Sequence, residues 1–401
     1  MTTLEAVSHD SIPTTASEIL AAARALAPRL RERSDEIEWA RRLPPDVVED
    51  LRLTGVFRAG FSTVQGGPGL TSAEQVEVIE ALSYGNPAAG WCAMIGMDSG
   101  IYAGYLDNDA AREMFPSLDL VTAGMLAPVG RAERVPGGFR LSGRWSFASG
   151  VTHADWISAG ARTWTDGEMD QVGGVPHWRI LMVPPGDVEL VDSWYATGLA
   201  GSGSLDYTIS DVFVPAERTF SFAEPRQTTG PLSPPDLQMR KMPGVPLGAA
   251  RAALDHVRRI SDGRTCRAAG GSWPDSYRVQ TELGECEADY RAARYAVLRS
   301  LHRRWDRLTP DSTLDDLTAD ERVETMLTRT YAFRAARSIV RRLYDLLATS
   351  AVYARSPLER ALRDLETMCQ HTVAQDQILQ SAGAHLVGGV PRFPLALGIV
   401  T

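Results

Sequence analysis

The spacing of apolar residues changes twice along this sequence, and those changes limit the folds open to it. From about Leu118 to Phe220, short runs alternate apolar and polar residues between Gly, Pro and Asp, which is typical of strands and turns. The residues before and after this zone carry apolar side chains at helical spacing. The sequence therefore predicts an α+β protein in which a β-sandwich or barrel lies between two helical parts.

Three domains are expected from these zones. They are an N-terminal helical domain over residues 1–117, a central β domain over 118–222 and a C-terminal helical domain over 223–401. The last domain has patterns for long helices, the final one over Leu358–Ala384. Such helices favour an antiparallel four-helix bundle, a common assembly surface, so we expect a homotetramer or dimer formed through the bundle.

Charge and cysteine content exclude several classes of function. The chain has 41 Lys plus Arg against 50 Asp plus Glu, and this net charge of −9 argues against a nucleic-acid partner. The cysteines, at 92, 266, 286 and 369, have neither zinc-site spacing nor a disulfide framework, so we expect no metal and a cytoplasmic location. No apolar run is long enough to span a membrane, and residues 1–13 lack a secretion signal.

The run from Trp145 to Gly150 is the strongest indication of a binding site. It alternates aromatic and small residues at the period of a strand and then breaks at Ser149-Gly150. An aromatic wall that ends in a hydroxyl beside exposed backbone suits a planar heterocycle with polar edges. In the alternative interpretation, Trp145 and Phe147 belong to the core and Ser149 caps its own turn.

The order of helices, sheet and bundle, together with several motifs, resembles the acyl-CoA dehydrogenase fold. The motifs are Arg42-Leu-Pro-Pro-Asp-Val-Val48, Gln65-Gly-Gly67, Gly198–Ser204, Asp211-Val-Phe-Val-Pro215 and Pro246–Asp255. Within this fold, Arg360-Ala-Leu-Arg363-Asp364 followed by His371 resembles a helix of the group D two-component flavin-dependent monooxygenases. Dehydrogenases of the fold need a carboxylate base, and Gln238 occupies one position expected for it, with Glu224 or Asp236 as the alternative counterpart.

The resemblance implies the oxygenase component of a two-component monooxygenase. Such a component takes FMNH2 or FADH2 from a separate flavin reductase and uses O2, through a C4a-hydroperoxide, to hydroxylate an aromatic or polyketide-like small molecule. The segment Gly198–Ser204 precedes a strand rather than a helix, so it is not a nicotinamide-binding fingerprint, which agrees with a separate reductase. An amino-sugar N-oxygenase of the same family and an acyl-CoA dehydrogenase-like FAD desaturase are the alternatives.

The resemblance also implies roles for individual residues. Ser149 is expected to meet the N5 or C4-carbonyl edge of the flavin, and His371 to act as acid or base or to bind a substrate hydroxyl. The expected cofactor contacts are Leu126, Ala127, Trp145, Phe147, Ser149, Gly150, Ser202, Ser204 and Arg264. The expected substrate contacts are Trp91, Cys92, Gln238 and Met368, the last where some members carry a second histidine. The alternatives are a core position for Trp91 and Cys92, a plain turn at Ser202, a surface position for Arg264 and a histidine between bundle helices.

Overall fold

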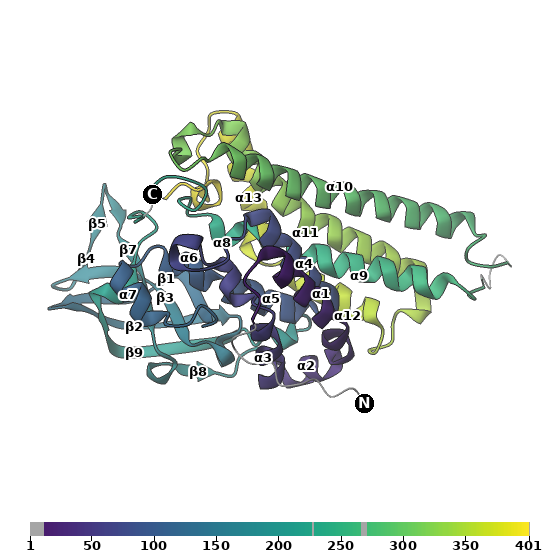
Figure 1. Cartoon of the computed structure of the whole chain (residues 1–401), viewed down its shortest axis with the longest axis horizontal. Helices are drawn as coiled ribbons and strands as arrows, with labels where there is room; N and C mark the ends of the chain where they lie inside the picture. Colours follow the sequence, from purple (N-terminus) through teal and green to yellow (C-terminus); the bar gives the residue numbers. More distant parts are fainter. Residues whose placement is uncertain (1–11, 227, 266–270, 401) are drawn as a thin grey trace.

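The computed structural model describes residues 12–226, 228–265 and 271–400 of the chain shown in Figure 1. Its N-terminal helices are α1 (Ala16–Glu32), α2 (Ser34–Ala40), α3 (Pro45–Leu53), α4 (Ser72–Gly85), α5 (Pro87–Gly96), α6 (Asp98–Ala103) and α7 (Asn108–Met114). Thr71 and Glu74 begin α4 with reciprocal side-chain to backbone hydrogen bonds, a capping box. Within the described residues, no helix is both long and apolar enough to cross a membrane.

The central part of the chain forms one mixed sheet. Its strands are β1 (Thr122–Val135), β2 (Gly138–Ala148), β3 (Trp156–Thr165), β4 (Glu168–Met169), β7 (Trp178–Val183), β8 (Glu189–Val191), β9 (Leu205–Pro215) and β10 (Thr219–Phe220). The order is β10-β7-β3-β1-β2-β9-β8, with β4 beside β3, and only the β1–β3 pair is parallel in this described sheet. A separate hairpin joins β5 (Gln171–Val172) and β6 (Val175–Pro176). The α+β class is confirmed, and the expected sandwich or barrel is one continuous sheet with β8 and β10 at its edges.

The C-terminal part is a bundle of long helices. After α8 (Leu237–Arg240) come α9 (Gly244–Ser261), α10 (Tyr277–Arg307), α11 (Ala319–Leu347), α12 (Pro357–Met368) and α13 (Asp376–Leu386). Figure 1 shows α9, α10 and α11 side by side, extending away from the sheet. The single helix expected over Leu358–Ala384 is wrong, because the backbone becomes extended at His371 and Gln375 and separates α12 from α13.

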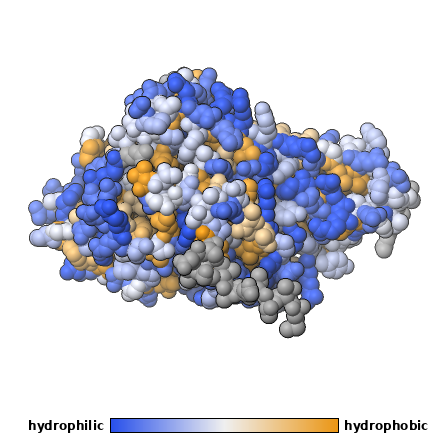
Figure 2. All heavy atoms as spheres, viewed as in Figure 1, coloured by the Kyte–Doolittle hydropathy of each residue, from blue (hydrophilic) through white to orange (hydrophobic). Residues whose placement is uncertain are grey.

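The two helical parts share one core, and the sheet packs against it. Helix α4 lies between α1 and α9, and a Cβ on Gly248 of α9 would overlap the backbone of α4. The sheet has its own buried cluster, which includes Leu141, Trp145 and Tyr207. Figure 2 shows a mainly hydrophilic surface, with apolar atoms gathered in the middle of this face. Cys92, Cys286 and Cys369 are buried free thiols, whereas Cys266 and residues 1–11 lie outside the described residues.

Candidate active site

Helix α5 carries the first side chains of the site to the end of the sheet. It begins with a proline after Asn86, whose side-chain oxygen accepts a hydrogen bond from the Ala89 N–H at 3.0 Å. Gly90 lies so close to α4 that a Cβ there would overlap the hydroxyl of Ser83. This close packing holds Trp91, which is 5% exposed, against the segments that follow β2 and β8.

A chain of hydrogen-bonded hydroxyls begins at Trp91. Its indole N–H donates to the Ser149 Oγ at 2.9 Å. The Ser204 hydroxyl is hydrogen-bonded to Ser149 on one side and to Ser202 on the other, with an O···O distance of 2.7 Å in each case. All three serines are buried, so their hydroxyl protons need partners inside the protein or on a ligand.

The direction of this hydroxyl chain follows from its donors and acceptors. Within the described residues, the Ser202 hydroxyl has no acceptor other than Ser204, so it satisfies its proton by donating to Ser204. Ser204 then donates to Ser149, whose two lone pairs are filled by Ser204 and Trp91. The Ser149 proton is left free, and Ser149 is 8% exposed against 1% and 4% for Ser202 and Ser204. Ser149 can therefore donate to a bound acceptor but has no lone pair left to accept.

Helix α12 holds the loop that carries Ser202 and Ser204. The Asp364 carboxylate accepts the Leu199 N–H at 2.6 Å, and Arg363 donates to the Thr197 carbonyl oxygen. Leu199 has a φ of 50°, a left-handed conformation that leucine rarely adopts without such support. Burial raises the pKa of Asp364 to about 6, against the opposing effect of the Leu199 N–H. The Arg-Asp motif thus acts on the site by positioning this loop.

His371 lies in the break between α12 and α13. Its Nδ1 accepts the Val373 N–H at 3.2 Å, so the proton of the neutral ring lies on Nε2. Burial, followed by the charge of Arg329, lowers the pKa of His371 to about 4 and keeps the ring neutral at pH 7. The side chain is exposed, although surrounding protein groups desolvate the ring. Its ring meets Trp91 edge-on, with centroids 5.5 Å apart.

A bulge in β1 turns backbone groups out of the sheet. Residues 126–129, which include Leu126 and Ala127, all lie opposite one residue of β3, Gly160. The backbone N–H and C=O groups of such a segment leave the ladder and become available to a ligand. A Cβ on Gly160 would overlap the Leu126 carbonyl oxygen, so this glycine permits the bulge. Leu126 is half-buried and Ala127 is exposed, as flavin contacts would require.

A second bulge lies in β2. The pairing of β2 with β9 shifts between Trp145 and Ala148, and Phe147 there has a φ of 67°. This conformation is rare for a bulky residue and is characteristic of functional sites. The Phe147 side chain is 63% exposed.

These features fit a flavin. The isoalloxazine ring is flat and carries nitrogen and carbonyl groups along its edge. Phe147 provides an exposed aromatic face, and the β1 bulge provides backbone hydrogen-bonding groups. The free proton of Ser149 suits an acceptor such as the C4 carbonyl oxygen rather than the N–H at N5 of reduced flavin.

Trp145 does not form the exposed wall expected from the sequence. It is 1% exposed, and its indole N–H donates to the Gly160 carbonyl oxygen at 2.8 Å. Its ring stacks on Tyr207 at a centroid distance of 5.2 Å. The Tyr207 hydroxyl accepts the Met125 N–H at 3.1 Å and donates to the Ser158 carbonyl oxygen at 2.7 Å. The expectation fails because the β2 bulge breaks the strand alternation, and Trp145 supports the β1 bulge from the core instead.

The other predicted substrate residues are Cys92, Met368 and Gln238, and the first two lie with Trp91 in the buried helical core. Cys92 and Met368 are each 1% exposed and pack in the helical core. The Cys92 thiol donates to the Ser202 carbonyl oxygen at 3.4 Å, and the Gly150 N–H donates to the same oxygen at 2.9 Å, so both position Ser202. Gln238 lies on α8, where its buried Oε1 has no hydrogen-bond partner within the described residues.

Arg264 is separated from the other predicted cofactor residues. It follows α9, in the connection to α10 that Figure 1 shows at the end of the bundle away from the sheet. Its guanidinium lies 4.8 Å from the Trp273 ring centroid and donates to the Ser350 hydroxyl at 2.8 Å. A flavin contact by Arg264 therefore requires a neighbouring copy of the chain.

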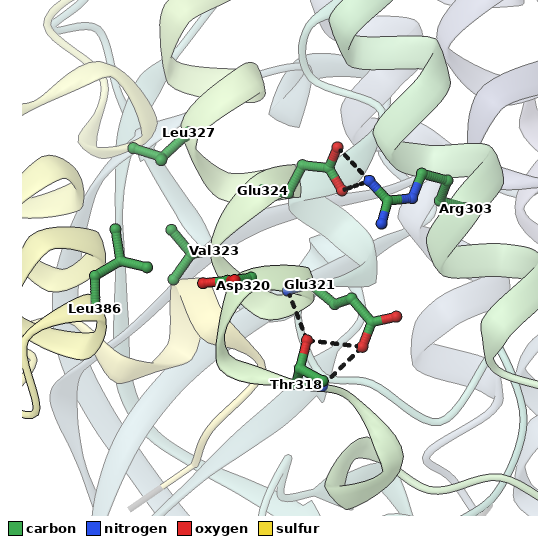
Figure 3. A pocket seen from close by; sticks show the side chains of 8 residues that line it. All are labelled: Arg303, Thr318, Asp320, Glu321, Val323, Glu324, Leu327 and Leu386. Carbon is green, nitrogen blue, oxygen red and sulfur yellow. Dashed lines mark hydrogen bonds and ion pairs between the residues drawn. The ribbon is translucent and has the colours of Figure 1, made fainter.

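A surface hollow of about 580 Å³ lies elsewhere, between α10, α11 and the end of α13 (Figure 3). In its lining, Arg303 binds Glu324, and the side chains of Thr318 and Glu321 cap the start of α11. None of the predicted site residues lines it. The candidate site is therefore the hydroxyl chain at Ser149, together with His371.

Neither Tyr207 nor the function of Asp364 is predicted from the sequence. Tyr207 is a buried aromatic residue of β9, and nothing in its neighbourhood in the sequence distinguishes it from other core positions. Asp364 belongs to the Arg-Asp motif, but its partner Leu199 lies 165 residues earlier. Only the tertiary contacts identify either residue as part of the site.

Comparisons with known proteins identify relatives over nearly the whole length of the chain. Residues 243–376 match the family model of the acyl-CoA dehydrogenase C-terminal domain. The chain is 30% identical over 367 residues to an indole-3-acetate monooxygenase of Pseudomonas putida, covering 90% of this chain and 92% of that protein. It is 28% identical over 392 residues to the oxygenase component of an FADH(2)-dependent resorcinol hydroxylase of Rhizobium sp., covering 92% and 93%.

A solved structure extends the comparison to the fold. XiaF from Streptomyces sp., in complex with FADH2 and glycerol, superposes with a TM-score of 0.84 at 23% identity, covering 94% of this chain and 96% of that one. This likeness confirms the acyl-CoA dehydrogenase-like fold. The identity to the Pseudomonas putida protein, which extends over nearly the whole chain, shows the family. The chain belongs to the flavin-dependent monooxygenases of the acyl-CoA dehydrogenase fold, as an oxygenase component that uses reduced flavin and O2.

Proposed function

We propose that this oxygenase component hydroxylates a small aromatic substrate, with Ser149 beside the flavin and His371 beside the substrate. The observation that carries the proposal is the position of Trp91. Its N–H bonds Ser149 at 2.9 Å, and its ring meets the His371 ring at a centroid distance of 5.5 Å. One rigid side chain therefore sets the spacing between the two predicted catalytic residues.

Each residue then has a defined hydrogen-bonding task. When bound, reduced flavin reacts with O2 and supplies the oxygen atom that enters the substrate. Ser149 donates its free proton to the carbonyl edge of the flavin and holds that edge in place. His371 is neutral and donates from Nε2 to an oxygen of the substrate, since its Nδ1 is occupied by the Val373 N–H. The buried ring of Trp91 keeps water out of the space between them.

The acids of the site support hydroxylation over desaturation. A desaturase of this fold needs a free carboxylate to remove a proton beside a carbonyl group. Within the described residues, the carboxylate hydrogen-bonded to the site is Asp364, and its oxygen is occupied by the Leu199 N–H. Gln238 has an amide, which does not take up a proton at neutral pH.

We also propose a separate flavin reductase as the partner. The loop at Gly198–Ser204 leads into β9, whereas a pyrophosphate site of the dinucleotide-binding type leads into a helix N-terminus. One relative is named as an oxygenase component that depends on FADH(2), and the names of both relatives contain small aromatic molecules, indole-3-acetate and resorcinol. These names support an aromatic substrate and an external source of reduced flavin.

Assembly through the bundle completes the proposal. Tyr277 and Tyr295 of α10 and Tyr331 of α11 are 82%, 70% and 49% exposed, which is unusual for large apolar side chains unless another surface covers them. A homotetramer or dimer would cover these faces, and it would bring Arg264 of one copy toward the flavin of another. The molar mass in solution, measured by light scattering, tests this assembly, and a monomer at micromolar concentration would refute it.

The activity itself is tested by supplying the cofactor directly. The purified chain is mixed with FMNH2 or FADH2, ¹⁸O2 and a panel of phenols and indoles. We expect one ¹⁸O atom in the product, and no oxygen uptake when NADH replaces the reduced flavin and no reductase is present. Sustained turnover with NADH alone would contradict the proposal. Anaerobic bleaching of oxidised flavin by an acyl thioester would establish the desaturase instead.

A further inference from the structure

A buried arginine cluster adjoins the site, and the function proposed above does not use it. Asp236, which immediately precedes α8, is ion-paired with Arg240 at 2.8 Å and with Arg304 at 3.0 Å. Arg329 of α11 lies near the same carboxylate, whose charge acts on it. The arginines are 2%, 3% and 1% exposed, in that order, and Asp236 is 0% exposed. We refer to these four residues as the arginine cluster.

The arginine cluster carries more positive than negative charge. Three guanidinium groups and one carboxylate leave a net charge of +2. Within the described residues, Asp236 is the only acid whose charge favours protonated Arg329, and the neighbouring Lys241 is already paired with Asp98. Guanidinium groups do not lose their proton in proteins, and an unpaired buried charge costs several kcal/mol. Such a charge is expected where an anion binds.

The unpaired hydrogen-bond donors show where that anion would bind. Within the described residues, none of the three guanidinium nitrogens of Arg329 has a partner, and Nε and Nη1 of Arg304 also have none. The remaining oxygen of Asp236, Oδ2, cannot accept hydrogen bonds from all five of these nitrogens. Guanidinium groups bind carboxylates through two parallel hydrogen bonds, so a second carboxylate would complete the arginine cluster.

The arginine cluster reaches the site through Arg329. The next residue, Thr330, donates to the Val373 carbonyl oxygen at 2.9 Å, two positions after His371. The charge of Arg329 also acts on the exposed His371 ring. The Arg329 nitrogens are inaccessible, so the side chain must turn toward the exposed His371 ring to meet a ligand. Its flexible stem allows such a movement.

We propose that Arg329, supported by Arg304, binds a carboxylate carried by the aromatic substrate, so that this enzyme acts on aromatic acids. The inference rests on the proposed function, because it concerns the ligand that lies beside His371. The carboxylate sets the position of the aromatic ring relative to Nε2 of His371. Neutral aromatic molecules would lack this anchor.

The test measures binding to the flavin-free chain with phenylacetate and its neutral counterpart phenylacetamide. We expect phenylacetate to raise the Tm of the wild-type chain and phenylacetamide to leave it nearly unchanged. Arg329→Met should weaken phenylacetate binding about 10- to 100-fold, as expected when a hydrogen bond to a charged group is lost. The matched control is Arg341→Met on the same helix, where Arg341 is 53% exposed and paired with Glu366, and it should bind phenylacetate normally.

A stability measurement separates ligand binding from a structural role. Because Arg329→Met removes an unpaired buried charge, its Tm without ligand should equal or exceed that of the wild type. Equal binding of the acid and the amide by the wild-type chain would overturn the proposal, even if every variant failed to fold. A rise in Tm with acetate as large as that with phenylacetate would also overturn it and indicate a simple anion site. Hydroxylation of neutral aromatics alone would leave the proposed function standing and remove only this inference.

Discussion

Replacing Ser149 with alanine removes the free proton at the end of the hydroxyl chain. Two buried donors, the Trp91 N–H and the Ser204 hydroxyl, would lose their acceptor. Each unsatisfied buried donor costs about 1–3 kcal/mol, so the free energy of unfolding should fall by about 2–6 kcal/mol. In the enzyme with bound flavin, loss of one donated hydrogen bond of about 1–3 kcal/mol corresponds to a change of about 5- to 150-fold in a rate ratio.

The assay for this variant measures how the reaction of reduced flavin with O2 divides between two products. Enzyme, reduced flavin, O2 and substrate are mixed, and hydroxylated product is counted against hydrogen peroxide. Ser149→Ala should lower that ratio by the factor given above. Ser202→Ala is the matched control, because it shortens the other end of the chain and leaves Ser204 donating to Ser149. Its product ratio should stay near that of the wild type.

Two results would refute this reasoning. An unchanged product ratio in Ser149→Ala would show that the Ser149 proton does not meet the flavin. An equal fall in Ser149→Ala and Ser202→Ala would show that the hydroxyls do not run from Ser202 to Ser149. In that case the free proton would belong to Ser202 or Ser204 instead of Ser149.

Three further variants test the other parts of the site. His371→Gln should reduce the rate of hydroxylation about 10²- to 10⁴-fold, as for loss of a general acid or base, and should leave the Kd for flavin unchanged. A loss of flavin affinity as large as the loss of rate would contradict the position of His371 beside the substrate. Burial raises the pKa of Asp364 in the folded state from 3.8 to about 6. Between these values the folded state binds more protons than the unfolded state, so the free energy of unfolding falls as pH rises from about 4 to 6. Asp364→Asn keeps an acceptor for Leu199 and should raise the Tm at pH 8 but not at pH 4, and a lower Tm at pH 8 would be the contrary result. Tyr207→Phe removes the hydroxyl that accepts the Met125 N–H, so it should lower the free energy of unfolding by about 1–3 kcal/mol and weaken flavin binding. Unchanged flavin affinity would show that the β1 bulge does not contact the cofactor.

The architecture could be predicted because local patterns carry it. Apolar spacing distinguishes the strands of residues 122–220 from the helices on either side, and it needs no knowledge of tertiary contacts. No local sequence pattern marks the break between α12 and α13. The segment Cys369–Gln375 contains neither proline nor glycine, so the spacing of its apolar residues predicts a helix without interruption. His371 was found by resemblance, while its position in a break was not predictable.

The site could be predicted only in part, for a related reason. The exposed Phe147 and the hydroxyl of Ser149 agree with a strand that ends in a binding site. Trp145 was misplaced because one extra residue in β2 changes which side chains share a face. The bond between Trp91 and Ser149 joins residues 58 positions apart, and nothing in either local sequence indicates that pairing.

The docking of α12 onto the loop around Leu199 has a consequence for the order of folding. Its central hydrogen bond joins residues 165 positions apart, and such contacts form late because the chain between them must first lose much of its conformational freedom. An immature chain with a finished sheet would still lack both the serine loop and His371 in their working positions. We therefore expect the ability to couple oxygen to hydroxylation to appear only after this docking, and the ratio of product to peroxide should report on maturation during refolding.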